Sequence, residues 1–214
     1  VQAYASLSDI FQAAPEYRKD ILETMKILLQ SYKNNDGCLK QVYKSLSDMF
    51  QAAPEYRKDI LETMKTVMQS DENYDEYNRN YSGLERAYEP LSEMFQAVPE
   101  YRKDILETMK IGLQSDKNYD DCLKQAYKSL NNMFQAVPEC RKDILETMKI
   151  GLQSDRNGGT SLIHAYESLS EMFQATPEYR KDILETMKIG LQSDKNNDDC
   201  LKQAYKSLNN MFQA

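Results

Sequence analysis

Apolar residues recur along this chain at the spacing of an amphipathic helix, and the same pattern returns several times. From Cys122 to Phe134 they fall three and four positions apart and cover an arc of about 140° on a helical wheel. These residues are Cys122, Leu123, Ala126, Tyr127, Leu130, Met133 and Phe134. A stripe of this width is typical of a helix that packs against a neighbour, so the pattern predicts a helix here.

A second apolar stripe begins at Pro99 and predicts a second helix. Proline suits the first position of a helix, and Glu100 suits its positive N-terminal end. Ile111 lies opposite the stripe, so this helix is expected to contact neighbours on two faces. The stripe itself contains Tyr101, Ile105, Leu106, Met109 and Leu113.

The two-helix pattern is an internal repeat that centres on "FQAVPEYRKDILETMK". Its first phenylalanine recurs at Phe11, Phe50, Phe95, Phe134, Phe173 and Phe212. The intervals are 39, 45, 39, 39 and 39 residues, and the longer one carries an insertion within residues 71–83. We predict one array over residues 1–214, with units of approximately 1–33, 34–72, 73–117, 118–156, 157–195 and 196–214, the last one partial. The first helices alternate between two forms, so units pair into super-units of about 78 residues.

The proline between the helices is compatible with two geometries. A reversal there makes each unit a hairpin, whereas a kink makes it a bent rod whose stripes a partner must cover. Most residues before the prolines are poor N-caps, and only Thr176 is expected to cap well. However, a residue before proline disfavours helix, and both stripes are wide enough to bury each other. We therefore predict the hairpin, and with it an all-α solenoid of helix–turn–helix repeats.

The helix pairs and the "PEYRKDILETM" opening of the second helix resemble the HEAT and armadillo class of α-solenoids. This resemblance covers the whole chain and implies stacked helix pairs that bind other proteins along an extended surface. Near-identical amphipathic units also resemble the giant backbone proteins of contractile ciliates. That resemblance implies binding of many copies of spasmin, a centrin-like EF-hand protein, to helices that carry Met and Phe.

Composition limits the class of binding partner and the cellular location that can be expected. The net charge is −7 and the sequence pI is about 4.9, which argues against a general nucleic-acid binder. No run of about 18 apolar residues is present, so no membrane partner is expected. The four cysteines occupy apolar positions of the repeat, which predicts buried thiols and an intracellular, cytoplasmic or cytoskeletal location. Because the chain starts and stops inside a repeat, a longer parent array is expected.

Candidate chemistry is sparse, and we predict a non-enzymatic protein without a cofactor or a metal site. His164 is the only histidine, and a surface role is expected for it. The acidic stretch Asp71–Ser82 has Glu76 and Ser82 where an EF-hand loop requires glycine and glutamate. Gly112, Gly151 and Gly190 lie within second helices, where close helix contact is expected to offset a cost of about 1 kcal/mol.

Two charge patterns remain. An Arg-Lys pair recurs in every second helix; because acidic residues flank it, we predict a solvated face that neutralises itself. Neighbouring first helices carry opposite charges, so Lys128 and Lys206 are each expected to pair with Glu167 and to fix the register.

The sequence therefore predicts a structural scaffold whose repeats bind protein partners multivalently and stack on neighbouring repeats. The alternative is the backbone of a contractile or cytoskeletal fibre that binds EF-hand proteins. The candidate partner-binding or inter-repeat packing residues are Phe95, Tyr101, Ile105, Met109, Leu130, Met133, Phe134, Met148, Met172, Phe173 and Met187.

Overall fold

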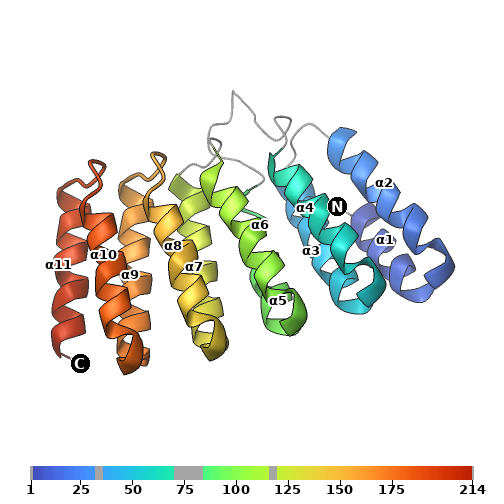
Figure 1. The fold of residues 1–214 in the computed structure, drawn as a ribbon. Helices are drawn as coiled ribbons and strands as arrows, with labels where there is room; N and C mark the ends of the chain where they lie inside the picture. The colour runs from blue at the N-terminus through green and yellow to red at the C-terminus, as the bar shows by residue number, and fades with distance from the viewer. Residues whose placement is uncertain (1, 32–35, 70–83, 116–119, 214) are drawn as a thin grey trace. The chain divides into compact units, whose positions relative to one another are not determined.

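The structure is a computed structural model that describes residues 2–31, 36–69, 84–115 and 120–213. Figure 1 shows its helices. The first helices of the repeats are α1 (Gln2–Ala13), α3 (Asp36–Ala52), α5 (Tyr88–Ala97), α7 (Asp120–Ala136), α9 (Gly159–Ala175) and α11 (Asp198–Gln213). The second helices are α2 (Arg18–Ser31), α4 (Arg57–Gln69), α6 (Arg102–Gln114), α8 (Arg141–Leu152) and α10 (Arg180–Leu191). The insertion and the acidic stretch Asp71–Ser82 lie outside the described residues.

A short 3₁₀ turn links the two helices of each repeat and begins at the proline. These turns are η1 (Pro15–Tyr17), η2 (Pro54–Tyr56), η4 (Pro99–Tyr101), η5 (Pro138–Cys140) and η6 (Pro177–Tyr179). The residue before the proline is extended, as at Val98 with φ −131° and ψ 89°, because the proline ring disfavours helical backbone there. The chain reverses at this point and α6 packs on α5, so the predicted hairpin is confirmed.

The chain forms two compact units, residues 1–117 and residues 118–214. In the first unit, α1, α3 and α5 lie side by side, and α2, α4 and α6 form the layer that packs on them. In the second unit, α7, α9 and α11 form one layer, and α8 and α10 form the other. Each unit is therefore a stack of helical hairpins, which confirms the all-α solenoid predicted from the 39-residue repeat.

The core of each repeat lies between the two layers. Its largest fully buried side chains are mainly tyrosines and phenylalanines of the first helices, such as Tyr127 and Phe134 of α7. From the first to the fifth repeat, the phenylalanine that marks the repeat in the sequence is thus a core residue at the C-terminal end of the first helix. The equivalent buried aromatic residues elsewhere are Phe11, Tyr43, Phe50, Tyr88, Phe95 and Tyr166.

The capping prediction for Thr176 is wrong. Its hydroxyl donates a 2.6 Å hydrogen bond to the Met172 carbonyl, at the end of the preceding helix, and caps no N–H group of α10. Burial explains this outcome, since Thr176 is fully buried under the turn and its hydroxyl must bond to the nearest carbonyl. Side-chain caps are found instead at the N-termini of α11, where Asn197 accepts from the N–H groups of Asp199 and Cys200, and of α9. The N-terminal N–H groups of α9 at Gly158, Thr160 and Ser161 donate to the carboxylate of Asp120 on α7.

Candidate binding surface

The residues proposed from the sequence for binding or packing lie inside the repeats. All of them are buried except Tyr101, which is half-buried. Phe95, Leu130, Met133, Phe134, Met172 and Phe173 come from first helices, and Ile105, Met109, Met148 and Met187 come from second helices. Because these side chains face the interior of the hairpins, we infer that they serve packing. A binding surface must be sought among other residues.

Each second helix begins with an arginine, and three of these arginines connect their own repeat to the next one. The Arg141 Nε donates a 3.2 Å hydrogen bond to the Phe134 carbonyl at the end of α7. The same guanidinium lies over the Phe134 ring and forms a 3.0 Å ion pair with Glu178 of the next repeat. Arg18 and Arg57 form the same set of contacts, to Phe11 and Glu55 and to Phe50 and Glu100, respectively.

The predicted solvated Arg-Lys face is therefore wrong for the arginines. The side chains of Arg18, Arg57 and Arg141 are only 13–15% exposed, because each reaches back over a phenylalanine. Their charge is neutralised by the following repeat, whereas the sequence pattern suggested neutralisation within one helix. The lysines beside them are exposed, as predicted.

Tyrosine and phenylalanine rings add a second link between successive repeats. Tyr56 meets Phe11 edge to face, with ring centroids 5.7 Å apart, and Tyr101 meets Phe50 at 5.3 Å. Tyr179 meets Phe134 in the same way at 6.0 Å. Each tyrosine follows directly after the glutamate that pairs with the arginine in the repeats concerned. The Pro-Glu-Tyr turn thus contributes both inter-repeat contacts.

A buried tyrosine–asparagine pair closes the end of the repeat. The Tyr127 hydroxyl donates to Asn157 Oδ1 at 2.8 Å, and Tyr166 donates to Asn196 Oδ1 at 2.7 Å. The Asn157 amide donates to the carbonyls of Gly151, Leu152 and Ser154 at the end of α8. Burial raises the pKa of both hydroxyls, that of Tyr166 to about 12. Both tyrosines therefore remain hydrogen-bond donors at neutral pH.

Sequence reasoning missed this pair, although a signal was present. The first-helix tyrosine is followed by an asparagine 30 residues later in every unit that is complete. The pairs are Tyr4 and Asn34, Tyr43 and Asn73, Tyr88 and Asn118, Tyr127 and Asn157, and Tyr166 and Asn196. The Tyr43 hydroxyl is buried without a hydrogen-bond partner among the described residues, and Asn73 lies outside them.

The glycines of the second helices permit close helix contact, as expected. A Cβ atom on Gly112 would lie 2.9 Å from the Tyr88 hydroxyl and would also meet the Met68 methyl group. At Gly190 it would lie 3.0 Å from the Tyr166 ring and 3.2 Å from Leu152. These glycines therefore make room for the tyrosine of the first helix.

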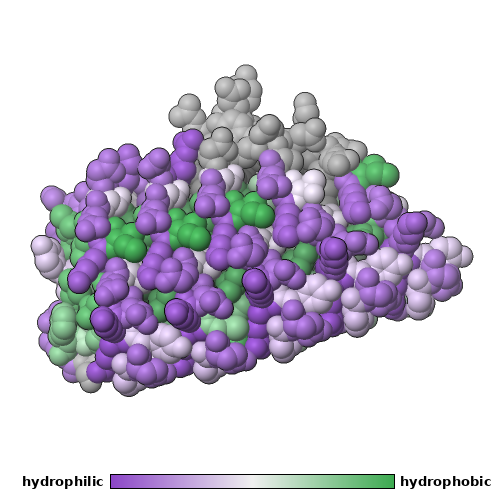
Figure 2. Space-filling view, viewed as in Figure 1, coloured by the Kyte–Doolittle hydropathy of each residue, from purple (hydrophilic) through white to green (hydrophobic). Residues whose placement is uncertain are grey.

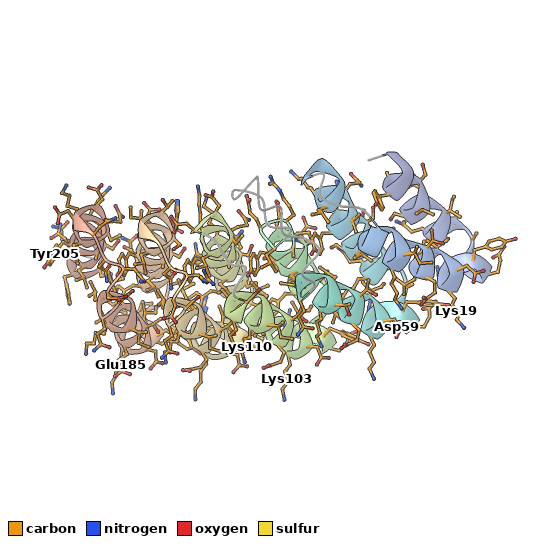
Figure 3. The ribbon with its side chains drawn as sticks, turned by 90° about the horizontal axis from the view of Figure 1, so that it is seen from above. Lys19, Asp59, Lys103, Lys110, Glu185 and Tyr205 are labelled. Atoms are coloured by element: carbon orange, nitrogen blue, oxygen red, sulfur yellow. The ribbon has the colours of Figure 1, made fainter. Side chains whose placement is uncertain are left out.

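The outward side of the second helices exposes the same residues in every repeat. We call this the outer second-helix surface, and Figure 3 labels Lys19, Asp59, Lys103 and Glu185 on it. Its exposed members are Lys19, Asp20, Glu23, Lys58, Asp59, Glu62, Lys103, Asp104, Glu107, Lys142, Asp143, Glu146, Lys181, Asp182 and Glu185.

Ion pairs and single aliphatic side chains complete the outer second-helix surface. Each glutamate from the first to the fourth repeat pairs with the lysine three positions on, as between Glu107 and Lys110 at 2.7 Å. An isoleucine follows this lysine in most repeats; Ile27 is 60% exposed and Ile150 is half-buried. Figure 2 accordingly shows a mostly hydrophilic face with separate hydrophobic spots over the second helices. On this surface the two lysines of one repeat balance its aspartate and glutamate. The surface therefore has a regular pattern of charges and no net charge.

The outward side of the first helices differs between repeats. In the first unit, Asp48 of α3 and Glu93 of α5 both have raised pKa values, mainly because of burial, and each is raised further by acidic neighbours. In the second unit, burial lowers the pKa of His164, and Lys124 and Lys128 act in the same direction. This surface therefore carries charges of both signs in each unit, with neighbouring acids on α3 and α5.

The predicted lysine pairs with Glu167 are not formed. Glu167 pairs with His164 of its own helix at 3.0 Å. The polar contact that does join α7 to α9 near this position is a 2.6 Å hydrogen bond from the Asn131 amide to the Glu171 carboxylate. Helix geometry favours the His164 contact because residues three apart lie on the same face, whereas Lys128 and Lys206 extend into solvent.

The described thiols follow the packing prediction in part: Cys122 and Cys200 are buried and Cys140 is half-buried, and none of the three forms a disulfide. Within the described part of the chain, no group of three or more His, Cys, Asp and Glu side chains is placed to hold a metal ion. None of the described helices is both long and apolar enough to cross a membrane.

No protein-family model matches the chain, and no curated protein has a significant sequence match to it. A similar fold is found in a chain from a homology model of the full-length AP-3 complex in an intermediate open conformation, with a TM-score of 0.65 and 13% sequence identity. The match covers 97% of this chain and 36% of that chain, so the protein spans about a third of its length.

A crystal structure of an engineered protein is also similar, with a TM-score of 0.50 and 17% identity, over 100% of this chain and 92% of that one. A second engineered protein has a TM-score of 0.45 and 16% identity over 99% and 90%. At these identities the likeness concerns the fold alone. The chain is an all-α helical-repeat solenoid, and its fold is similar to the folds of these structures.

Proposed function

We propose that the protein is a non-enzymatic scaffold that binds a protein partner multivalently through the outer second-helix surface. The observation that supports this is the repetition of exposed residues. Lys19, Asp20 and Glu23 recur at the same positions in all five second helices, and every copy is exposed. Substitutions at exposed helix positions typically change stability by less than about 0.5 kcal/mol. Packing therefore does not require the same lysine, aspartate and glutamate at these positions in every repeat.

The first helices supply an internal comparison. Their exposed positions change between repeats, as from Lys44 in α3 to Glu89 in α5 and Lys128 in α7. The same repeats therefore tolerate charge changes on one surface while they keep the other surface constant. This contrast favours the outer second-helix surface as the place where a partner is recognised.

A surface that repeats suits a partner that also repeats. Helices in adjacent hairpins pack about 8–10 Å apart, so several copies of one weak site are presented at short intervals. Linked weak sites give an avidity well above the affinity of one site. The partner would carry a repeated charge pattern with small apolar contacts, which match the isoleucines between the Glu-Lys pairs.

The alternative partner is an EF-hand protein that takes Met- and Phe-bearing helices as targets. In the described residues these side chains, such as Met109 and Phe134, are buried in the hairpins. Such binding therefore requires a hairpin to open. Size-exclusion mixing with calmodulin or centrin, with and without calcium, tests it, and the absence of a complex in both conditions excludes it.

The outer-surface proposal is tested with two variants of equal charge change. The first reverses five lysines of the outer second-helix surface to glutamate: Lys19, Lys58, Lys103, Lys142 and Lys181. The second reverses five lysines of the first helices to glutamate: Lys40, Lys44, Lys124, Lys128 and Lys206. Each protein is used for cross-linking capture from lysate with quantitative mass spectrometry.

We expect the first variant to lose the captured partners and the second to retain them. Shortened arrays with fewer second helices should also bind the partner more weakly. The loss of affinity should be greater than the loss in number of second helices, because avidity depends on linked sites. Equal loss in both variants would indicate general electrostatics. Selective loss in the second variant would assign binding to the first helices, and either outcome contradicts the proposal.

A further inference from the structure

Asn157 and Gly158 form the only Asn-Gly pair in the sequence. In the next repeat the equivalent pair is Asn196 and Asn197, so the asparagine that accepts from the tyrosine is shared and the glycine is not. The φ of Gly158 is −114°, which other residues also adopt, so the backbone conformation does not require glycine. A Cβ atom at this position would, however, lie 2.8 Å from Oδ1 of Asp120. The glycine therefore admits the Asp120 carboxylate to the backbone beside Asn157.

The side-chain oxygen of Asn157 lies among hydroxyl groups. Oδ1 accepts the 2.8 Å hydrogen bond from Tyr127 and lies 3.3 Å from the Ser161 hydroxyl. Because burial raises the pKa of the Tyr127 hydroxyl, this group stays a donor at neutral pH. A donor at this distance stabilises the negative charge that develops on the oxygen when a nucleophile attacks the adjacent carbon. The arrangement therefore activates the Asn157 carbonyl group toward attack.

The backbone nitrogen of Gly158 can attack that carbon and close a succinimide ring, and a base contacts its proton. The Gly158 N–H group donates to Asp120 Oδ1 at 3.1 Å. Burial alone would raise the pKa of Asp120, but hydrogen bonds from Ser161 and Thr160 together hold it below its ordinary value, so the carboxylate is ionised at neutral pH. A carboxylate within hydrogen-bond reach of the proton that must be removed meets the geometric requirement of a general base.

We propose that Asn157 and Gly158 form a self-modification site at which the folded chain converts the asparagine to aspartate or isoaspartate. The Gly158 nitrogen bonds to Cγ of Asn157, and its proton passes to Asp120. The bond from Cγ to the amide nitrogen then breaks, and that nitrogen takes up the proton and leaves as ammonia. Water afterwards opens the succinimide at either carbonyl group, so the net change is the gain of a water molecule and the loss of an ammonia molecule. This site does not depend on the function proposed for the outer second-helix surface.

The reaction removes a donor on which the end of α8 depends. The Asn157 amide donates to the carbonyls of Gly151, Leu152 and Ser154, whereas a carboxylate only accepts hydrogen bonds. The product also adds a negative charge beside the C-terminal end of a helix, where the helix dipole disfavours it. The modification therefore loosens α8 from α7 and makes the stability of the second unit depend on the age of the chain.

The fifth repeat provides a comparison within the same chain. Asn196 accepts from Tyr166 at 2.7 Å and donates to two backbone carbonyls near the end of α10, so its amide is held in the same way. However, Asn197 follows it in place of glycine and caps α11 with its own side chain. Gly159 stands where the preceding repeat has Asp120. This site thus lacks both the glycine and the carboxylate, and we expect Asn196 to remain unmodified.

The test compares the full 214-residue chain with a blocked peptide of residues 152–163, "LQSDRNGGTSLI", which has the same Asn-Gly pair without the fold. Mass spectrometry of protease fragments measures succinimide, aspartate and isoaspartate at Asn157 and Asn196 during incubation. We expect Asn157 in the folded chain to react at least about tenfold faster than in the peptide, because a positioned base assists it. The rate in the folded chain should change little between about pH 6 and pH 8, whereas the rate in the peptide should rise with the hydroxide concentration.

Matched variants separate the chemistry from the packing. D120N removes the base but keeps an oxygen that can accept from α9, and it should slow the reaction at least about tenfold. D121N makes the same charge change at the exposed neighbouring carboxylate and should leave the rate unchanged. Y127F removes the donor to Oδ1 and should also slow the reaction. Circular dichroism checks that each variant is folded, because an unfolded variant would react at the rate of the peptide.

The proposal is overturned if Asn157 reacts no faster in the folded chain than in the peptide, because the hydrogen bonds would then protect the amide. It is also overturned if D120N reacts as fast as D121N, since Asp120 would then serve only as a helix cap. A chain aged until Asn157 is converted, and the variant N157D, should both unfold at a lower urea concentration than the fresh chain. Equal urea midpoints would contradict the effect on the stability of the second unit.

Discussion

The Tyr127 hydroxyl donates a 2.8 Å hydrogen bond to Asn157, which lies 30 residues later and ties the end of α8 to α7. The asparagine amide is shared among three backbone carbonyls at the end of α8. One side chain therefore satisfies a buried hydroxyl and the unpaired carbonyls that every helix leaves at its C-terminus. This makes the asparagine a structural requirement of the repeat, although it stands in a polar loop.

The first prediction concerns that asparagine. Replacing Asn157 by leucine should destabilise the second unit by about 2–4 kcal/mol, because a buried hydroxyl and several carbonyls lose their partners. Urea unfolding followed by circular dichroism measures the loss. The matched control is Asp155→Ala in the same loop, where the exposed side chain should change stability by less than about 0.5 kcal/mol. Equal effects of the two substitutions would show that the tyrosine–asparagine pair carries no stability.

The arginine contacts give a second prediction with an internal control. Arg141→Gln removes the carbonyl contact, the ring contact and the ion pair to Glu178, whereas Arg180→Gln removes only the first two. We expect R141Q to cost about 1–2 kcal/mol of unfolding free energy. R180Q should cost less by about 0.5–1 kcal/mol, the usual value of a partly exposed ion pair. If urea unfolding shows an equal loss of stability in the two variants, the ion pair between Arg141 and Glu178 does not contribute to the free energy of unfolding.

The helices and their pairing could be predicted from the sequence because both depend on apolar spacing. The stripe from Cys122 to Phe134 is buried as its period requires. The hairpin also followed from local chemistry, since proline after an extended residue ends one helix and begins the next. Repetition amplified these signals, because the same pattern indicated the same structure in each unit.

The contacts between repeats could not be predicted in the same way. The flanking acids made Arg141 look neutralised within its helix, yet its partner Glu178 is 37 residues away. Such pairings depend on how far one hairpin is displaced from the next, and helix periodicity holds no information about that displacement. The outer second-helix surface was overlooked for a related reason. Its residues are polar and exposed, so only the comparison of surfaces in three dimensions separates constant positions from variable ones.

The third prediction concerns Gly112→Ala, for which helix propensity and side-chain packing have opposite effects on stability. Gly112→Ala should strengthen the isolated helix by about 1 kcal/mol, since alanine is the better helix former. In the folded unit the added methyl group would lie 2.9 Å from the Tyr88 hydroxyl, and such overpacking costs about 1–3 kcal/mol. We therefore expect a net loss of stability in thermal unfolding. Gln114→Ala, at an exposed position of the same helix, should show no loss. A stabilised G112A protein would mean that the helices separate at little cost.

The fourth prediction concerns the acidic side of the first unit. Burial raises the pKa values of Asp48 and Glu93. Nearby acids raise them further: Asp9 acts on Asp48, and both Glu89 and Asp48 act on Glu93. A raised pKa in the folded state means that the folded protein binds protons more readily than the unfolded chain. Stability should therefore increase as the pH falls through these raised values toward about 4, the ordinary range of carboxyl groups. Above that window the ionised pair opposes folding.

The double variant D48N/E93Q removes this opposition. At pH 7 it should be more stable than the natural chain, by no more than about 1 kcal/mol because both groups are partly solvated. At pH 4 the advantage should be clearly smaller, since the raised pKa values favour protonation of the natural carboxyl groups in the folded state. Urea titrations at the two pH values measure the difference, and the exposed Asp59→Asn substitution serves as the control for net charge. An advantage that is undiminished at pH 4 would place its origin in packing or hydrogen bonding. The repulsion between neighbouring first helices would then have no part in the stability of this unit.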